Sequence, residues 1–407
     1  MDRANGRLLR NRAFRTVAGG EVLSMLGDYA YQVAFAWLVL SATGSAVTLA
    51  AVMICNVVPN GLLILVGGAV TDRWSPKAVM FCSHLSRGLL VLGLCVLTVT
   101  GSARVWQFYA MAAAFGLADA FFWPASGSIV PLLVQPGDLP AANALLAGGE
   151  QVALFAGPLL GGAVMSAFSP SAVLAVNAAT FFIAAVTVLR APAVSARQKQ
   201  RWSARGLLSS ITSGLSYARG AADVRAVLVV VSASTLAYSG LFAVALPAFA
   251  RADGHGSLAL GVLVACWGLG QLLGAVSAGI TGLPRRWGVL IIGMALCEGI
   301  AFVVIGAAGS LPVACSLLAV LGIGVAYSSD VALPTWIQVS TPAEMLGRVN
   351  SLISLPRAVL QPVSLAVMGA LAAASARFPF YFAAVLMLLA GGVLALNPAA
   401  RTLSAEN

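Results

Sequence analysis

The sequence contains twelve apolar stretches, most of them near or beyond the ~20 residues with which an α-helix crosses a bilayer. These stretches are nearly continuous, whereas the strands of a membrane barrel would show alternating segments of about ten residues. We therefore predict an all-α polytopic membrane protein with twelve transmembrane helices. The predicted spans are residues 16–40, 46–70, 78–100, 105–127, 141–166, 171–189, 226–249, 257–280, 287–307, 310–333, 347–373 and 378–397.

Charged residues are too scarce for a water-soluble surface. They make up 9% of the 407 residues, and 60% are hydrophobic, whereas a soluble domain carries about 25% charged residues. The amino-terminal segment shows no small-residue cleavage site, so we expect the first apolar stretch to be retained as a helix.

The net charge of +10 is explained by membrane topology. With the amino terminus inside, only Arg104, Arg251 and Arg377 of the 23 Lys and Arg fall in outer loops, while Arg87 and Arg357 fall inside spans. This asymmetry follows the positive-inside rule. We predict a cell inner-membrane protein with both termini cytoplasmic. No basic stripe is interleaved with aromatic residues, so nucleic acid is excluded as a partner.

The chain divides into two similar halves. Residues 136–145 resemble residues 342–352. Each segment leads into a span that begins with an Asn and carries a charged residue seven positions later, Glu150 in the first half and Arg357 in the second. Repeats separated by an even number of spans have the same membrane orientation, which is typical of transporters built from two parallel bundles. The predicted domains are residues 1–189, a basic cytoplasmic linker at 190–225, and residues 226–407.

The loop between the second and third spans carries a family resemblance. Gly68, Asp72, Arg73 and Lys77 resemble the loop signature of the major facilitator superfamily, which has a Gly, then Asp-Arg, then basic residues. This resemblance implies two pseudo-symmetric six-helix bundles around a central cavity. It also implies transport by alternating access.

Two further motifs resemble drug:proton antiporters of that superfamily. Gly157, Pro158 and Gly161 in the fifth span resemble the end of the antiporter motif, and Gly27-Asp28 in the first span is similar to the third drug:proton antiporter family. That family has macrolide-efflux-like and siderophore-exporter-like members. The resemblance implies a proton-coupled exporter.

Polar residues form two stripes at helical spacing inside the predicted membrane. The stripe on the first span consists of Glu21, Ser24, Asp28 and Gln32. The stripe on the eleventh span consists of Asn350, Ser354, Arg357, Gln361 and Ser364. Ionisable groups at mid-membrane cost at least ~2.5 kcal/mol on insertion scales, so they usually face a cavity or a partner. We expect both stripes to line the central cavity that the resemblance implies.

Four charged residues lie near the predicted midplane. Arg357 and Glu150 are about ten and nine residues inside their spans, roughly 15 Å deep, and Arg87 and Asp28 are similarly deep. Our hypothesis is that Asp28 or Glu150 takes up the coupled proton and Arg357 is its counter-charge. The alternative is a static Glu150–Arg357 pair that joins the halves.

Charges near the cytoplasmic ends of spans four and ten predict gating ion pairs. Asp119 could pair with Arg73, and Asp330 with Arg285 or Arg286. In the superfamily resemblance such pairs close the cytoplasmic side. The alternative is that these groups are solvated at helix ends. For His84 we favour a packing role, with a proton relay as the alternative, and no role is assigned to Glu298.

No nucleophile–base constellation, metal-ligand spacing or phosphate-binding loop is present in the sequence. We therefore expect no enzymatic activity, no metal and no cofactor, with the proton motive force as the energy source. The expected partners are a small-molecule substrate, protons and the lipid bilayer, and we expect a monomer. The predicted function is proton-coupled export of an amphipathic or lipophilic molecule such as an antibiotic, drug or siderophore. Uptake of a small metabolite is the alternative, and a non-transporting sensor or enzyme is a remote one.

Overall fold

The computed structural model describes residues 8, 10–192, 222–252, 254–282, 286–341, 343–397 and 401. In these residues twelve helical spans are long and apolar enough to cross a membrane, which confirms the predicted all-α, twelve-helix architecture. Several helices run a few residues past the predicted spans; α2, for example, covers Arg12–Thr43.

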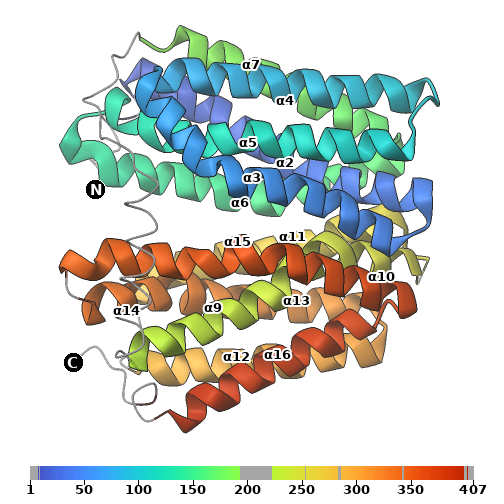
Figure 1. Ribbon diagram of the computed structural model, residues 1–407, viewed down its shortest axis with the longest axis vertical. Coiled ribbons are helices and arrows are strands. Elements are labelled where there is room, and N and C mark those ends of the chain that lie inside the picture. Colours follow the sequence, from blue (N-terminus) through green and yellow to red (C-terminus); the bar gives the residue numbers. More distant parts are fainter. Residues whose placement is uncertain are drawn as a thin grey trace. The chain divides into compact units, whose positions relative to one another are not determined.

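Helices α2 to α7 supply most of a first compact unit, which lacks the start of α3 and includes His255–Ala265. Within it α2 packs against α6 and α7, and α4 packs against α5 and α7 (Figure 1). Its elements are α2 (Arg12–Thr43), α3 (Ala46–Arg73), α4 (Pro76–Val99), α5 (Val105–Leu133), η1 (Pro136–Asp138), α6 (Leu139–Ala167) and α7 (Pro170–Arg190).

Helices α9 to α16 supply most of a second compact unit. Its elements are α9 (Ala222–Gly240), η2 (Leu241–Ala245), α10 (Leu246–Ala252), α11 (Gly256–Thr281), α12 (Trp287–Ala308), α13 (Leu311–Val325), η3 (Ala326–Ala332), α14 (Leu333–Ser340), α15 (Ala343–Ala374) and α16 (Phe378–Leu396). The segments η2 and η3 are π-helical. Such turns are frequent at functional sites.

Local sequence signals fix several helix starts. The side chain of Asn11 accepts a hydrogen bond from the Phe14 amide at the start of α2, and Ser75 and Ser169 cap α4 and α7 in the same way. A proline follows each of these serines, where its fixed φ suits the first helical turn.

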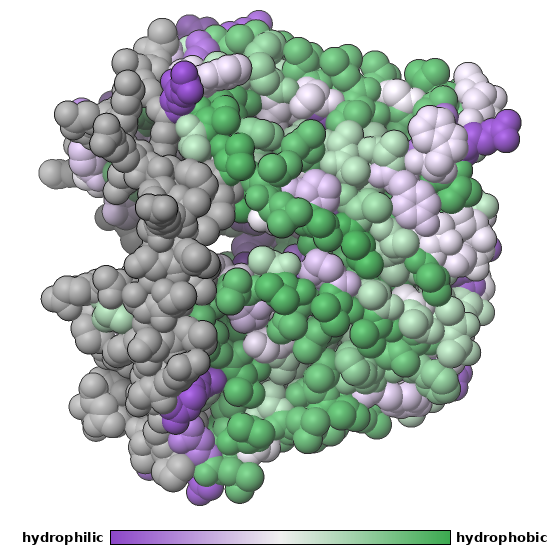
Figure 2. Space-filling view, viewed as in Figure 1, coloured by the Kyte–Doolittle hydropathy of each residue, from purple (hydrophilic) through white to green (hydrophobic). Residues whose placement is uncertain are grey.

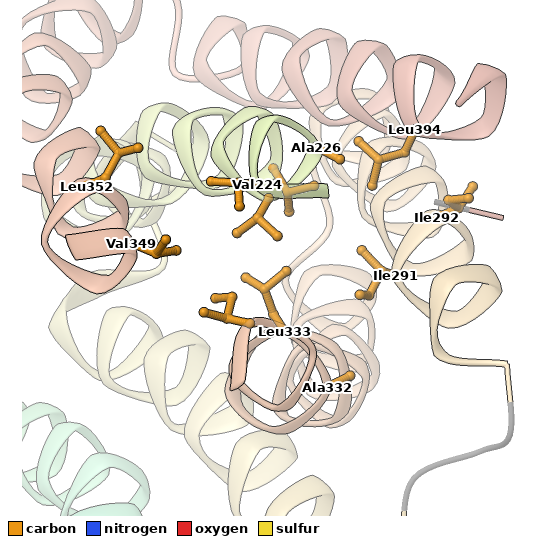
Figure 3. Close-up of a cluster of buried hydrophobic side chains, with 12 residues drawn as sticks. Val224, Ala226, Ile291, Ile292, Ala332, Leu333, Val349, Leu352 and Leu394 are labelled. Carbon is orange, nitrogen blue, oxygen red and sulfur yellow. The ribbon is translucent and has the colours of Figure 1, made fainter. Parts of the chain in front are cut away.

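Apolar side chains face outward as well as inward. Leu62, Ile280 and Leu396 are 72%, 81% and 78% exposed, and hydrophobic residues cover most of the described surface in the view of Figure 2. A lipid-facing surface explains this distribution, because the bilayer core offers polar groups no partners. Inside the second unit, Val224, Leu333 and Val349 converge from α9, α14 and α15 on a common core (Figure 3).

Candidate functional site

A chain of polar contacts lies inside the first unit, between α2, α4 and α5. Arg87 Nη1 donates to Asp119 Oδ1 at 3.0 Å and to Asp28 Oδ2 at 3.4 Å. Arg87 Nη2 lies 3.1 Å from His84 Nδ1, and His84 Nε2 lies 2.8 Å from Glu21 Oε1. We call these five residues the charge network.

The neighbours of His84 define its tautomer. A guanidinium can only donate hydrogen bonds, so Nδ1 of His84 accepts from Arg87. The ring proton therefore sits on Nε2, which donates to Glu21. This assignment follows from the hydrogen-bond pattern, and it makes His84 neutral as long as its contact with Arg87 persists.

Aromatic rings surround the guanidinium of Arg87. Its Cζ atom lies 4.1 Å from the centroid of the Phe122 ring and 4.5 Å from that of Phe181. A cation over an aromatic face is stabilised by the ring quadrupole, more strongly when it is desolvated. The side chain of Arg87 is 2% exposed, so the rings exclude water from the one permanent cation of the charge network.

Negative groups outnumber positive ones in the charge network. Three carboxyl groups, those of Glu21, Asp28 and Asp119, accompany Arg87 alone, because His84 is neutral. The oxygens Glu21 Oε2 and Asp28 Oδ1 are buried without a hydrogen-bond partner among the described residues. Holding all three carboxylates ionised in a dry interior is costly. The arrangement therefore favours binding of protons.

Among these carboxyl groups Asp28 is the most accessible. Its side chain is 22% exposed, against 17% for Asp119 and 5% for Glu21. The buried side chain of Asn177 on α7 lies beside the Asp28 carboxyl. A proton can therefore reach the charge network most directly through Asp28.

Glu150 lies outside the charge network. It is half-buried on α6, and the hydroxyl of Tyr29 donates to its Oε1 at 3.4 Å. Pairing of Arg357 with Asp28 or Glu150 stays a prediction.

The structure corrects one expectation about partners. Asp119 pairs with Arg87, and not with Arg73, which is exposed at the end of α3. His84 is fully buried against the rings of Phe122 and Phe181, and both of its ring nitrogens are hydrogen-bonded within the charge network. Its role as a packing residue or a proton relay stays a prediction.

The predicted stripe on the first span divides in two. Glu21 and Ser24 are buried inside the first unit, where Glu21 meets α4, so they do not line an open cavity. Gln32 is exposed. On α15, Arg357 is exposed and Gln361 is half-buried, while the side chain of Asn350 lies outside the described residues.

The loop-signature residues lie at helix ends. Gly68 belongs to the last turns of α3, and Lys77 Nζ donates to the carbonyl of Ala191 at 2.5 Å, which ties the start of α4 to the end of α7. Arg286 and Asp330 are exposed, Asp330 within η3. The side chain of Asp72 and all of Arg285 lie outside the described residues.

The Gly-Pro motif of α6 allows close packing against α2. A Cβ atom on Gly157 would lie 2.7 Å from Tyr29 Cβ and 2.8 Å from the carbonyl oxygen of Leu26, and one on Gly161 would lie 2.9 Å from Ala30 Cα. These glycines, with Pro158 between them, bring α6 against the face of α2 next to Asp28.

We expect Gly157→Ala to destabilise the protein by about 1–3 kcal/mol, the usual cost of overpacking. The added methyl group would meet backbone that cannot move without separating α2 from α6. Gly148→Ala is the matched control on the same helix, because nothing lies within 4 Å of its Cβ position. Thermal unfolding in detergent measures both; equal midpoints for the two variants would contradict the close packing.

Comparisons with known proteins agree with this architecture. The family model "Major Facilitator Superfamily" matches residues 17–360. The chain is 26% identical over 373 residues to the multidrug efflux pump Tap of Mycolicibacterium fortuitum, covering 89% of this chain and 90% of Tap. It is 27% identical over 319 residues to the enterobactin exporter EntS of Shigella boydii, covering 76% and 73%.

Other matches are shorter or show the fold alone. The MFS-type transporter YfiS of Bacillus subtilis is 27% identical, but the alignment spans 52% of this chain and 50% of YfiS. Among solved structures, the POT family transporter PepTSo aligns with a TM-score of 0.74 at 14% identity, over 95% of this chain and 97% of that one. With the family match covering most of the sequence, this chain belongs to the major facilitator superfamily and is a membrane transporter, not an enzyme.

Proposed function

We propose that this transporter is a proton-coupled exporter of an amphipathic or lipophilic small molecule. The observation that carries the proposal is the charge network, in which Asp28 and Asp119 share the buried Arg87 and Glu21 pairs with His84 beside it. Such a site can exist with or without an added proton on Asp28. Its protonation state can therefore follow the pH on whichever side of the membrane it faces.

Coupling would work through the partners of Arg87. When Asp28 is ionised, it competes with Asp119 for Arg87 Nη1. When Asp28 is protonated, Arg87 is left to Asp119 and His84, and α2 is released from its ion pair with α4. We propose that this exchange biases the alternating-access equilibrium. A charge crossing 100 mV supplies about 2.3 kcal/mol.

Similarity to Tap and EntS supports export, and it suggests a drug or a siderophore as substrate. We propose that Gln32, Glu150, Asn350, Arg357 and Gln361 contact this substrate. Insertion in the inner membrane with both termini cytoplasmic belongs to the same proposal, as does the division into residues 1–189, 190–225 and 226–407. A gating role for Asp330 with Arg285 or Arg286, and for the loop with Asp72, is also proposed.

Inside-out vesicles test both the coupling and the direction of transport. We expect vesicles that contain the protein to accumulate ethidium or enterobactin when their lumen is acidified, and a protonophore to abolish the accumulation. Vesicles without the protein are the control. Substrate leaving preloaded inside-out vesicles together with protons from an acidified lumen would instead indicate uptake by the cell and would contradict export.

A further inference from the structure

The second unit contains a buried carboxyl group at the position that Arg87 occupies in the first. Glu298 is the twelfth residue of α12, as Arg87 is of α4. The next residue is a glycine in both helices. Gly88 packs closely against Phe182 of α7, and Gly299 against Leu388 of α16, the last membrane helix of each unit. The two units therefore place an arginine and a glutamate at equivalent positions.

Tyr238 of α9 is the polar neighbour of Glu298. Its hydroxyl lies near the Glu298 carboxyl and is buried without a hydrogen bond to the described residues. Its ring stacks on Phe242 at 6.1 Å between centroids, as Tyr31 stacks on Phe35 in the first unit at 5.3 Å. The pseudo-symmetry of the two units thus extends from the charged position to the aromatic pair beside it.

Glu298 has no cation nearby among the described residues of α9 and α12. It is 3% exposed, and its Oε2 makes no hydrogen bond to the described residues. Arg225 on α9 is thirteen residues from Tyr238, and Arg286 is twelve from Glu298, so each lies roughly 18–20 Å away along its helix. The other titratable groups on α12 and on the helices packed against it are Cys297, Cys315, Tyr327, Asp330 and Tyr381.

The aromatic rings around Tyr238, the polar neighbour of Glu298, are closely packed. The rings of Phe242, Trp267 and Phe302 lie 5.0–6.1 Å from their neighbours in the cluster, centroid to centroid, which is contact distance. A cage for an organic cation would need these rings spread apart. A buried carboxylate without a cation is strongly disfavoured, so the ligand that fits is a proton.

We propose that Glu298 is a second proton-binding site, loaded and emptied within the C-terminal unit during transport. The role of Glu298 in the transport cycle rests on the proposed proton coupling. The binding of a proton to Glu298 does not depend on that proposal. A transporter with one such site in each unit would move two protons per cycle, one through Asp28 and one through Glu298.

Infrared difference spectra of the purified protein in lipid, recorded between alkaline and acidic pH, test this site without any substrate. We expect the wild-type protein to gain carboxylic-acid carbonyl bands on acidification, and Glu298→Gln to lack one of them. Tyr238→Phe should keep that band but shift the pH at which it appears. Gln271→Leu, which replaces another buried polar group of this unit, should leave the band unchanged. Identical bands in wild type and Glu298→Gln, or a Glu298 band present at every pH, would overturn the proposal.

Proton counting separates the failure of this inference from that of the proposed function. With ethidium as the transported probe in proteoliposomes, Glu298→Gln should move half as many protons per ethidium as wild type. An unchanged ratio would overturn the role of Glu298 while leaving proton-coupled export intact. If the wild-type protein moved ethidium without protons, the proposed function would fail. The infrared spectra would still show whether Glu298 binds and releases a proton.

Discussion

Replacing Arg87 with methionine is expected to destabilise the folded protein by about 3–5 kcal/mol, the usual cost of removing one partner from a buried ion pair. Methionine matches the length of the arginine stem and packs well against Phe122 and Phe181. It donates no hydrogen bond, however, so Asp28, Asp119 and Nδ1 of His84 would all lose their donor. Total stabilities of folded proteins are of order 5–15 kcal/mol. The loss is therefore a large fraction of the total, and Arg87→Met should unfold at a clearly lower temperature than the wild-type protein.

The matched control is Arg12→Met, which removes an exposed arginine at the start of α2. Thermal unfolding of the two purified variants in detergent compares them directly. Adding Asp119→Asn to Arg87→Met should restore part of the stability, because it removes one stranded charge; coupling between contacting residues is typically 0.5–3 kcal/mol. Arg87→Met and Arg12→Met unfolding at the same temperature would show that the charge network does not stabilise the fold.

Asp28→Asn is expected to lower pH-driven accumulation of substrate sharply while leaving the protein folded. Asparagine keeps the shape of the side chain and an oxygen that can accept from Arg87, but it cannot release a proton. Each coupled proton contributes about 1.4 kcal/mol per pH unit, which corresponds to a tenfold accumulation ratio. The ratio should therefore fall at least about tenfold for each pH unit of gradient.

Counterflow in the absence of a gradient separates coupling from binding. Asp28→Asn should still exchange internal for external ethidium, because this exchange needs no net proton movement. The matched comparison is Glu150→Gln, which alters a carboxyl group whose described partner is Tyr29 and not Arg87. Normal pH-driven accumulation by Asp28→Asn, with loss in Glu150→Gln, would move the coupling site from Asp28 to Glu150.

The sequence was sufficient to predict the twelve spans, because the thickness of the bilayer dictates both their length and their apolar character. It also identified Glu21 and Asp28 as one polar face of the first helix. Periodicity gives the face but not the helix that packs against it. The partner of Asp119 was therefore assigned to the loop residue Arg73, when packing of α4 against α5 brings Arg87 to it.

Two features depend on tertiary structure that spacing does not encode. His84 looked like a packing residue because its bond to Glu21 joins positions 63 residues apart. Glu298 had no assigned role because its neighbour Tyr238 lies on another helix and stands among apolar residues in the sequence. An alignment of the two halves places Arg87-Gly88 opposite Glu298-Gly299. That alignment would have drawn attention to Glu298.

The most direct test of the account is release of protons when substrate binds. Ethidium or enterobactin is added to the purified transporter in weakly buffered detergent solution, and a pH-sensitive dye follows the protons released. We expect the wild-type protein to release protons as substrate binds and Asp28→Asn to release measurably fewer at the same occupancy. Saturable substrate binding by the wild-type protein with no release of protons would contradict it.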